Sequence, residues 1–176
     1  PTIKGMEKEG MPFTGFLYAG LMIDDKGGVK TLEFNTRMGD PETQPIMLRL
    51  KSDLLEVLLA ATQPDGLLDL ELEWDRRSAL GVVLAAPGYP AQPRKGDRIH
   101  GLPSAVVQDE PGNEAVVFHA GTVQQGEGVV SNGGRVLCVT ALGDNLRQAQ
   151  QNAYAAVAKI NFDGMQYRKD IIGRAS

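Results

Sequence analysis

The sequence has little of what marks secreted, membrane or metal-cluster proteins. It has one cysteine, Cys138, so no internal disulfide is possible, and the two histidines, His100 and His119, lack metal-ligand spacing. No apolar run approaches the roughly 20 residues that cross a bilayer, and no passage resembles a secretion signal. We therefore expect a cytoplasmic protein with no membrane partner, in which both histidines are structural.

The sequence also has no excess of positive charge. Its 18 lysines and arginines are mixed with 22 acidic residues, which gives a net charge of −4. Nucleic-acid binding is therefore not expected, and an anionic ligand must be held by a few local groups. The 42% hydrophobic content over 176 residues supports one large domain or two small ones.

The chain opens at Pro1, without an initiator methionine and inside a passage with the pattern of folded structure. We therefore expect it to be a fragment of a longer protein.

The first half of the sequence predicts a hairpin followed by helices. Residues 15–23 are apolar with small residues interleaved, which predicts a strand buried on both faces. Residues 24–28 are of types that favour a turn, and residues 29–35 alternate between apolar and polar side chains, which predicts a second strand. The two strands, 15–23 and 29–35, should therefore pair antiparallel. Helical spacing begins at Thr43 and restarts near Asp53, a capping position; its apolar positions are Ile46, Met47, Leu50, Leu54, Leu55 and Leu58.

The second half predicts short strands at residues 79–86, 115–120 and 135–141. A helix capped by Asp144 should then cover the sheet, because its apolar residues recur every three or four positions: Leu146, Ala149, Ala153, Val157 and Ile160. A polar stretch separates the two halves, so we predict one domain at residues 1–75 and a β-rich domain at residues 76–176. The predicted fold class is α/β (α+β).

The segment EFNTRMGDPETQ, residues 33–44, carries the strongest chemical signal. Side chains two apart on a strand share a face, so Glu33 and Asn35 should lie side by side, joined by Arg37 if the strand continues. Magnesium prefers such hard oxygen ligands and keeps phosphate oxygens and water in its other positions. These residues predict a site for metal-bound polyphosphate, although an isolated Glu-x-Asn is more often solvated or capping.

The following loop adds two carboxylates. Gly39 and Pro41 favour a tight loop that holds Asp40 and Glu42 beside the predicted metal face. Carboxylates next to a cation site can hold an ammonium group or take up a proton.

Arg135 is a second candidate, because it follows Asn132, Gly133 and Gly134. Exposed backbone amides and a guanidinium in this arrangement could contact a phosphate or a nucleotide. A plain hairpin turn at Asn-Gly-Gly is an equally good interpretation, and the two are compatible.

Taken in order, eight segments resemble the C-terminal portion of the phosphoribosylamine-glycine ligase (glycinamide ribonucleotide synthetase) family. They are GFLYAGLM, EFNTRMGDPETQP, SDLLEVLLAA, SALGVVLAAPGYP, GDRIHGLP, FHAGT, SNGGRVLCVTALG and YRKDI. The resemblance covers essentially the whole chain. It implies the end of an ATP-grasp domain followed by a small β-rich domain with a covering helix.

The resemblance also implies a reaction. ATP phosphorylates the carboxylate of glycine, and the amine of 5-phosphoribosylamine attacks the glycyl phosphate, giving glycinamide ribonucleotide, ADP and phosphate in purine biosynthesis. Glu33 and Asn35 match the family's ligands for Mg²⁺ or Mn²⁺, and Arg37 matches the arginine expected on the phosphoryl oxygens. Asp40 and Glu42 match the loop expected near the glycine amino group or the incoming amine.

The glycine-rich loop, phosphate lysines and adenine pocket of an ATP-grasp ligase are not found in the sequence, and no P-loop replaces them. We therefore expect the chain alone to be inactive, to need the N-terminal part of the enzyme as partner, and to be prone to self-association through an open strand edge. The alternatives are another ATP-grasp ligase or carboxylase, or a non-catalytic interaction module derived from the fold.

Overall fold

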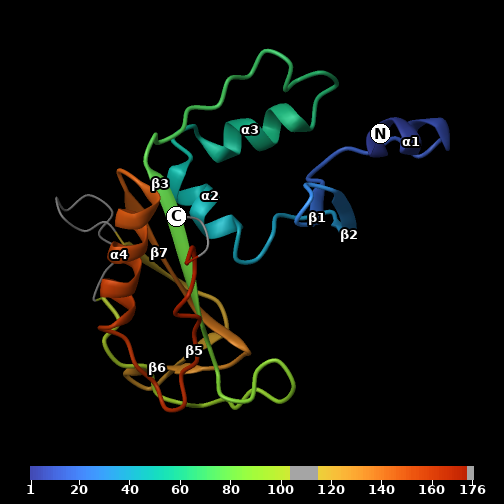
Figure 1. The fold of residues 1–176 in the computed structure, drawn as a ribbon. Helices are drawn as coiled ribbons and strands as arrows, with labels where there is room; N and C mark the ends of the chain where they lie inside the picture. Colours follow the sequence, from blue (N-terminus) through green and yellow to red (C-terminus); the bar gives the residue numbers. More distant parts are fainter. Residues whose placement is uncertain (104–114, 174–176) are drawn as a thin grey trace. The chain divides into compact units, whose positions relative to one another are not determined.

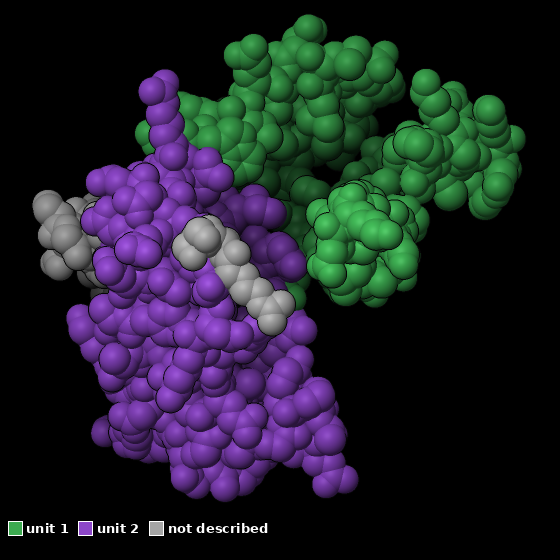
Figure 2. Space-filling view, in the orientation of Figure 1, with its two compact units in different colours: residues 1–40, 50–74 green, residues 41–49, 75–176 purple. Residues whose placement is uncertain are grey.

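The computed structural model describes residues 1–103 and 115–173 (Figure 1). The chain divides into two compact units, coloured separately in Figure 2. Unit 1 comprises residues 1–40 and 50–74, and unit 2 comprises residues 41–49 and 75–176. Helices and antiparallel sheets occur together, which confirms the predicted α/β (α+β) class, while the predicted domain boundary between residues 75 and 76 stays a prediction.

Unit 1 contains the predicted hairpin, formed by β1 (Tyr18–Ile23) and β2 (Val29–Asn35), which pair antiparallel. The turn is held by Asp24, whose Oδ1 accepts hydrogen bonds from the backbone N–H groups of Lys26 and Gly28 at 3.0 and 2.8 Å. Such a local side-chain bond fixes a turn without tertiary support. The hairpin is therefore encoded by its own short sequence.

The prediction for β1 was wrong in two respects. The strand begins at Tyr18 rather than residue 15, and it is not buried on both faces: Leu21, Met22 and Ile23 are 50%, 54% and 66% exposed. Within the described residues β1 pairs only with β2, and these three apolar side chains stay exposed. Unit 1 also begins with a helix that the sequence did not predict, α1 (Thr2–Lys8).

The second part of unit 1, residues 50–74, is a segment whose two ends lie next to each other. It carries α3 (Leu54–Ala61), which begins as predicted after Asp53, whose side chain accepts a 2.8 Å hydrogen bond from Leu55 N. Its ends meet at a bridge between Leu50 and Trp74. The flanking residues belong to unit 2, where Asp75 N donates to the Arg49 carbonyl at 2.7 Å.

Unit 2 is built on a three-stranded antiparallel sheet in the order β3-β7-β4, from β3 (Ser78–Ala85), β4 (Ala115–His119) and β7 (Arg135–Gly143). The three predicted strands are thereby confirmed. Leu84, Leu137 and Val82 are fully buried between the sheet and its covering helix. Burying a side chain of this size contributes about 1.5–3 kcal/mol, so this core dominates the stability of unit 2.

The covering helix is α4 (Leu146–Val157), which packs on β7 and β3 as predicted (Figure 1). It buries Ala149, Ala153 and Val157, whose spacing places them on one face. Its cap is Asn145 rather than the predicted Asp144, because the Asn145 side chain accepts a 3.0 Å hydrogen bond from Gln148 N. Ile160 is buried as well but lies beyond the end of the helix.

Unit 2 also has a small hairpin and a short helix. The hairpin pairs β5 (Thr122–Gln125) with β6 (Gly128–Ser131), and residues 97–99 run beside β6, as in the 2.9 Å bond from Ile99 N to the Val129 carbonyl. The helix is α2 (Thr43–Arg49), which packs on β3 and β7. Among the helices of the described residues, none has the length and apolar character needed to cross a bilayer.

Candidate functional site

The Glu-x-Asn pair lies at the end of β2. Glu33 pairs with Gly20 of β1 and Asn35 pairs with Tyr18, in consecutive register. Because side chains alternate along a strand, Glu33 and Asn35 project from the same face. Glu33 is exposed, whereas Asn35 is half-buried and its Nδ2 atom is buried.

The neighbouring register is irregular. Gly20 pairs with Glu33, whereas the next residue of β1, Leu21, pairs with Thr31, so Leu32 is the extra residue of a β-bulge. Bulges kink a strand and change the direction of the side chains that follow. The bulge therefore comes directly before the two oxygen-bearing side chains and helps to set where they point.

The amide of Asn35 has one buried end without a partner. Its Nδ2 makes no hydrogen bond within the described residues although the atom is buried. A buried amide N–H without a partner costs free energy, so it calls for an explanation such as a ligand or a water. The atom belongs to the residue two positions after Glu33 on β2, and as a donor it could bond an oxygen of a bound ligand.

Arg37 does not continue the strand. β2 ends at Asn35, so the condition under which Arg37 would share the face of Glu33 is not met. Its side chain is exposed, and Nη1 donates a 3.1 Å hydrogen bond to the neighbouring Met38 carbonyl. A bond to an adjacent exposed carbonyl is weak, so the guanidinium can exchange it for an anion at small cost.

The acidic loop leads directly into α2. Residues 40–42 form a turn, and the Glu42 carbonyl accepts the first helical hydrogen bond from Ile46 N at 3.2 Å. Asp40 and Glu42 are both exposed. Asp40 closes the first segment of unit 1, while Glu42 belongs to unit 2, so the predicted grouping of both carboxylates beside Glu33 stays a prediction.

Arg135 is already engaged at the start of β7. Its Nε donates a 2.9 Å hydrogen bond to the hydroxyl of Tyr89, and the side chain is half-buried. A Cβ built on Gly134 would lie 2.3 Å from Cδ2 of the Tyr89 ring, so only glycine leaves room for that ring. The alternative of a hairpin turn at Asn-Gly-Gly was wrong, because β6 and β7 pair with other strands.

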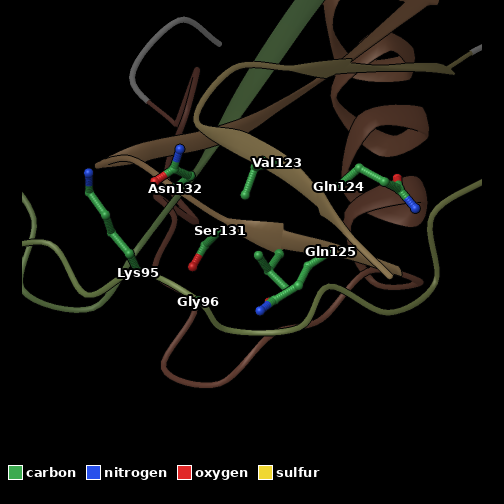
Figure 3. Close-up of a pocket in the computed structure, with 8 residues that line it drawn as sticks. Lys95, Gly96, Val123, Gln124, Gln125, Ser131 and Asn132 are labelled. Atoms are coloured by element: carbon green, nitrogen blue, oxygen red, sulfur yellow. The ribbon is translucent and has the colours of Figure 1, made fainter. Parts of the chain in front are cut away.

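A hollow of about 430 Å³ lies on unit 2 between the β5–β6 hairpin and the loop before Ile99 (Figure 3). Lys95 is its cationic residue, and the Ser131 hydroxyl beside it already accepts a 3.1 Å hydrogen bond from Asp97 N. In Figure 3 the Lys95 and Gln124 side chains lie at opposite ends of the hollow. No local motif indicates this hollow, because its walls come from three separate segments of the chain.

The donor set at the end of β2 fits a hard divalent cation in part. The described residues contain no cluster of three or more histidine, cysteine, aspartate or glutamate side chains that could enclose a metal. Mg²⁺ does not require one, because it is usually bound through one or two carboxylates and keeps water and substrate phosphates as its other ligands. The Glu33 carboxylate and the Asn35 amide oxygen supply hard oxygens of this kind.

Comparison with protein-family models gives two matches in chain order. Residues 1–43 match the phosphoribosylglycinamide synthetase ATP-grasp (A) domain, and residues 79–174 match the phosphoribosylglycinamide synthetase C domain. The chain belongs to the phosphoribosylglycinamide synthetase family. The first match contains Glu33, Asn35, Arg37, Asp40 and Glu42, whereas Arg135 lies in the second.

Relatives of this synthetase family match nearly the whole chain. Phosphoribosylamine-glycine ligases from Ralstonia nicotianae and Escherichia coli O157:H7 are 60% and 58% identical over 99% of this chain and 40% of their own lengths. A crystal structure of the ligase from Thermotoga maritima, 38% identical, superposes with a TM-score of 0.75 over 95% of this chain and 39% of that chain. The chain thus spans about 40% of the curated synthetases that it matches.

Proposed function

We propose that the protein containing this chain joins glycine to 5-phosphoribosylamine at the expense of ATP, through a glycyl phosphate, and releases glycinamide ribonucleotide, ADP and phosphate. The names of the relatives support this reaction, and so do the two synthetase domain matches. The observation that carries it is the placement of Glu33 and Asn35 on one face at the end of β2. The activity belongs to the whole protein, of which this chain supplies one edge of the site.

In this proposal Glu33 and Asn35 hold a Mg²⁺ or Mn²⁺ ion through the carboxylate and the amide oxygen. When bound, the ion neutralises charge on the nucleotide phosphates. Arg37, whose Nη1 donates to the adjacent Met38 carbonyl, turns its guanidinium to the oxygens of the transferred phosphoryl group.

Asp40 and Glu42 are proposed to act on the amine side of the reaction. Both are exposed carboxylates on the turn before α2. A carboxylate there can hold the ammonium group of glycine, or take up the proton that the attacking amine loses as the C–N bond forms. Arg135 is proposed as a contact for phosphate or nucleotide, with Tyr89 holding its guanidinium in place.

The first test replaces Glu33 in the full-length ligase. Glu33→Gln keeps the size of the side chain but removes its charge, so turnover at ordinary magnesium concentration should fall about 100-fold or more, the scale seen when one group stabilising developing charge is removed. Glu71→Gln is the matched control, because Glu71 is also an exposed glutamate of unit 1. Unchanged turnover in Glu33→Gln would remove Glu33 from the site.

The second test concerns the chain as a partner in a larger enzyme. Release of ADP in the presence of glycine and 5-phosphoribosylamine should be undetectable with this chain alone. It should appear when the separately expressed N-terminal part is added. Robust turnover by the chain alone would contradict the proposal, and failure of a folded pair to restore activity would favour a non-catalytic interaction module.

The identity of the carboxylic acid substrate distinguishes the proposed ligase from the remaining alternative, another ATP-grasp enzyme. Another ATP-grasp enzyme, such as a carboxylase, would use the same edge but activate a different carboxylate. ADP release by the full-length protein should therefore require glycine and should not respond to bicarbonate. Release driven by bicarbonate in the absence of glycine would favour a carboxylase instead.

A further inference from the structure

Gly20 faces Glu33 across the β1–β2 hairpin. The two residues are direct partners in the register, and the bulge follows immediately at Leu21. A Cβ built on Gly20 would lie 3.0 Å from Cγ of Glu33, and 3.7 Å from its carbonyl oxygen. The first distance is shorter than a normal carbon–carbon contact, so the stem of Glu33 occupies the space that any other residue at position 20 would need.

The crowded atom is the one that determines where the carboxylate lies. Cγ of Glu33 carries the carboxyl group, so moving Cγ by a few tenths of an ångström turns the oxygens away from their position. Glu33 is exposed and can move without disturbing a core. An added Cβ would therefore displace the carboxylate rather than unfold the hairpin.

We propose that Gly20 is a positioning residue. Because it has no side chain, it leaves the space next to Cγ of Glu33 free, and the carboxylate can then bind a divalent cation together with Asn35. This inference rests on the proposed function, in which Glu33 and Asn35 are ligands. Mg²⁺ accepts ligands only in near-ideal octahedral geometry at about 2.0–2.1 Å, so a small displacement of one oxygen weakens binding. Gly20 acts through Glu33 and touches neither the cation nor the substrates.

A purely structural role for Gly20 is the competing explanation, because glycine often marks a bulge. The hairpin offers a matched control at its other end. Gly28, like Gly20, lacks a left-handed φ, and a Cβ there would lie 2.6 Å from Oδ2 of Asp24, the residue that holds the turn. Gly28→Ala therefore strains the same hairpin by the same chemical change, away from Glu33.

The experiment measures cation binding directly. Mn²⁺ is titrated into the full-length ligase with saturating ADP, and free Mn²⁺ is followed by electron paramagnetic resonance. Gly20→Ala should raise the dissociation constant for Mn²⁺ about tenfold, the lower end of the effect of altering the support of a metal ligand. Gly28→Ala should bind Mn²⁺ like the unaltered enzyme, and thermal unfolding of both variants should stay close to it.

Two further measurements distinguish positioning from general damage. In Gly20→Ala, turnover should recover at high Mg²⁺ concentration, because the ligands are present but displaced. The double variant Gly20→Ala with Glu33→Gln should bind Mn²⁺ no more weakly than Glu33→Gln alone, because Gly20 acts only through that carboxylate.

The outcomes are distinct. If Glu33→Gln weakens Mn²⁺ binding and Gly20→Ala does not, the positioning role is wrong and the proposed function stands. If Gly20→Ala and Gly28→Ala weaken binding equally, Gly20 serves the hairpin alone and the inference is overturned. If Glu33→Gln leaves Mn²⁺ binding unchanged, the proposed metal site itself fails.

Discussion

Strands β2 and β7 both pair antiparallel with their neighbours but have opposite surroundings. β7 buries eight of its nine residues between β3, β4 and α4, whereas β2 buries none of its seven. Leu32 and Phe34 of β2 are 64% and 50% exposed. In unit 1 Gly39 is the one buried residue. Stability therefore resides in unit 2, while the oxygen ligands proposed for the cation lie in unit 1.

The largest expected effect comes from truncating a buried leucine in unit 2. Leu84→Ala should lower the free energy of unfolding by about 2–5 kcal/mol, because it leaves a cavity in a fully packed core. The same change in β2, Leu32→Ala, should alter it by no more than about 0.5 kcal/mol, as at other exposed positions. Urea unfolding followed by circular dichroism compares the two variants.

Equal losses for the two leucines would break the comparison between the units. They would show that Leu32 is buried in the folded protein and that the β1–β2 hairpin unfolds cooperatively with the core of unit 2.

An intermediate effect is expected from the helix caps. Asn145→Ala removes the side chain that caps α4, and should cost about 1 kcal/mol of unfolding free energy. Asp53→Ala removes the equivalent cap of α3, which buries no residue. Because α3 adds nothing to the core, its cap should change helix content by circular dichroism without moving the main unfolding transition. A comparable shift in that transition would place α3 within the cooperative unit.

The smallest expected effect depends on pH. Burial raises the pKa of the Tyr154 phenol above its ordinary value, and its hydroxyl donates a 2.7 Å hydrogen bond to the Arg168 carbonyl. The folded chain thus holds this proton more tightly than the unfolded chain. The resulting stability is complete below about pH 10, the unfolded pKa, and is lost as pH rises through the folded pKa.

Tyr154→Phe removes this titrating group from unit 2. Urea unfolding of the variant should therefore depend less on pH than that of the unaltered chain between about pH 9 and about pH 11. Identical pH dependence of the two proteins would mean that the phenol titrates alike in the folded and unfolded chains.

Local chemistry accounts for what the sequence predicted well. The Asp24 turn and the Asp53 cap each depend on one side chain bonded to a backbone N–H a few residues away. The apolar spacing of Ala149, Ala153 and Val157 likewise required only the period of a helix. The position of Glu33 and Asn35 on one strand followed in the same way from their spacing of two residues, while their role as ligands stays a prediction.

The features that sequence reasoning missed depend on residues far apart in the chain, or on a choice between two neighbouring residues that suit the same role. Tyr89 holds Arg135 across 46 positions, and no local pattern indicates such a pair. Asp144 and Asn145 are adjacent and both suit a cap, so only the backbone conformation distinguishes them. The burial of β1 was overestimated because an apolar strand predicts a covering layer but not which stretch of chain supplies it.

The chain passes between its two units three times, at residues 40/41, 49/50 and 74/75, because α2 belongs to unit 2 while the segments on either side of it do not. A chimera that takes unit 2 from a relative would therefore need three junctions, one at each of these points. If the two proteins were joined only near residue 75, α2 would come from a different protein than the rest of unit 2. Removing part of unit 1 is easier, because the hydrogen bond between Asp75 N and the Arg49 carbonyl holds the two ends of the cut together. Residues 50–74 leave and re-enter at adjacent points, so a short linker could replace them in an engineered minimal version of unit 2.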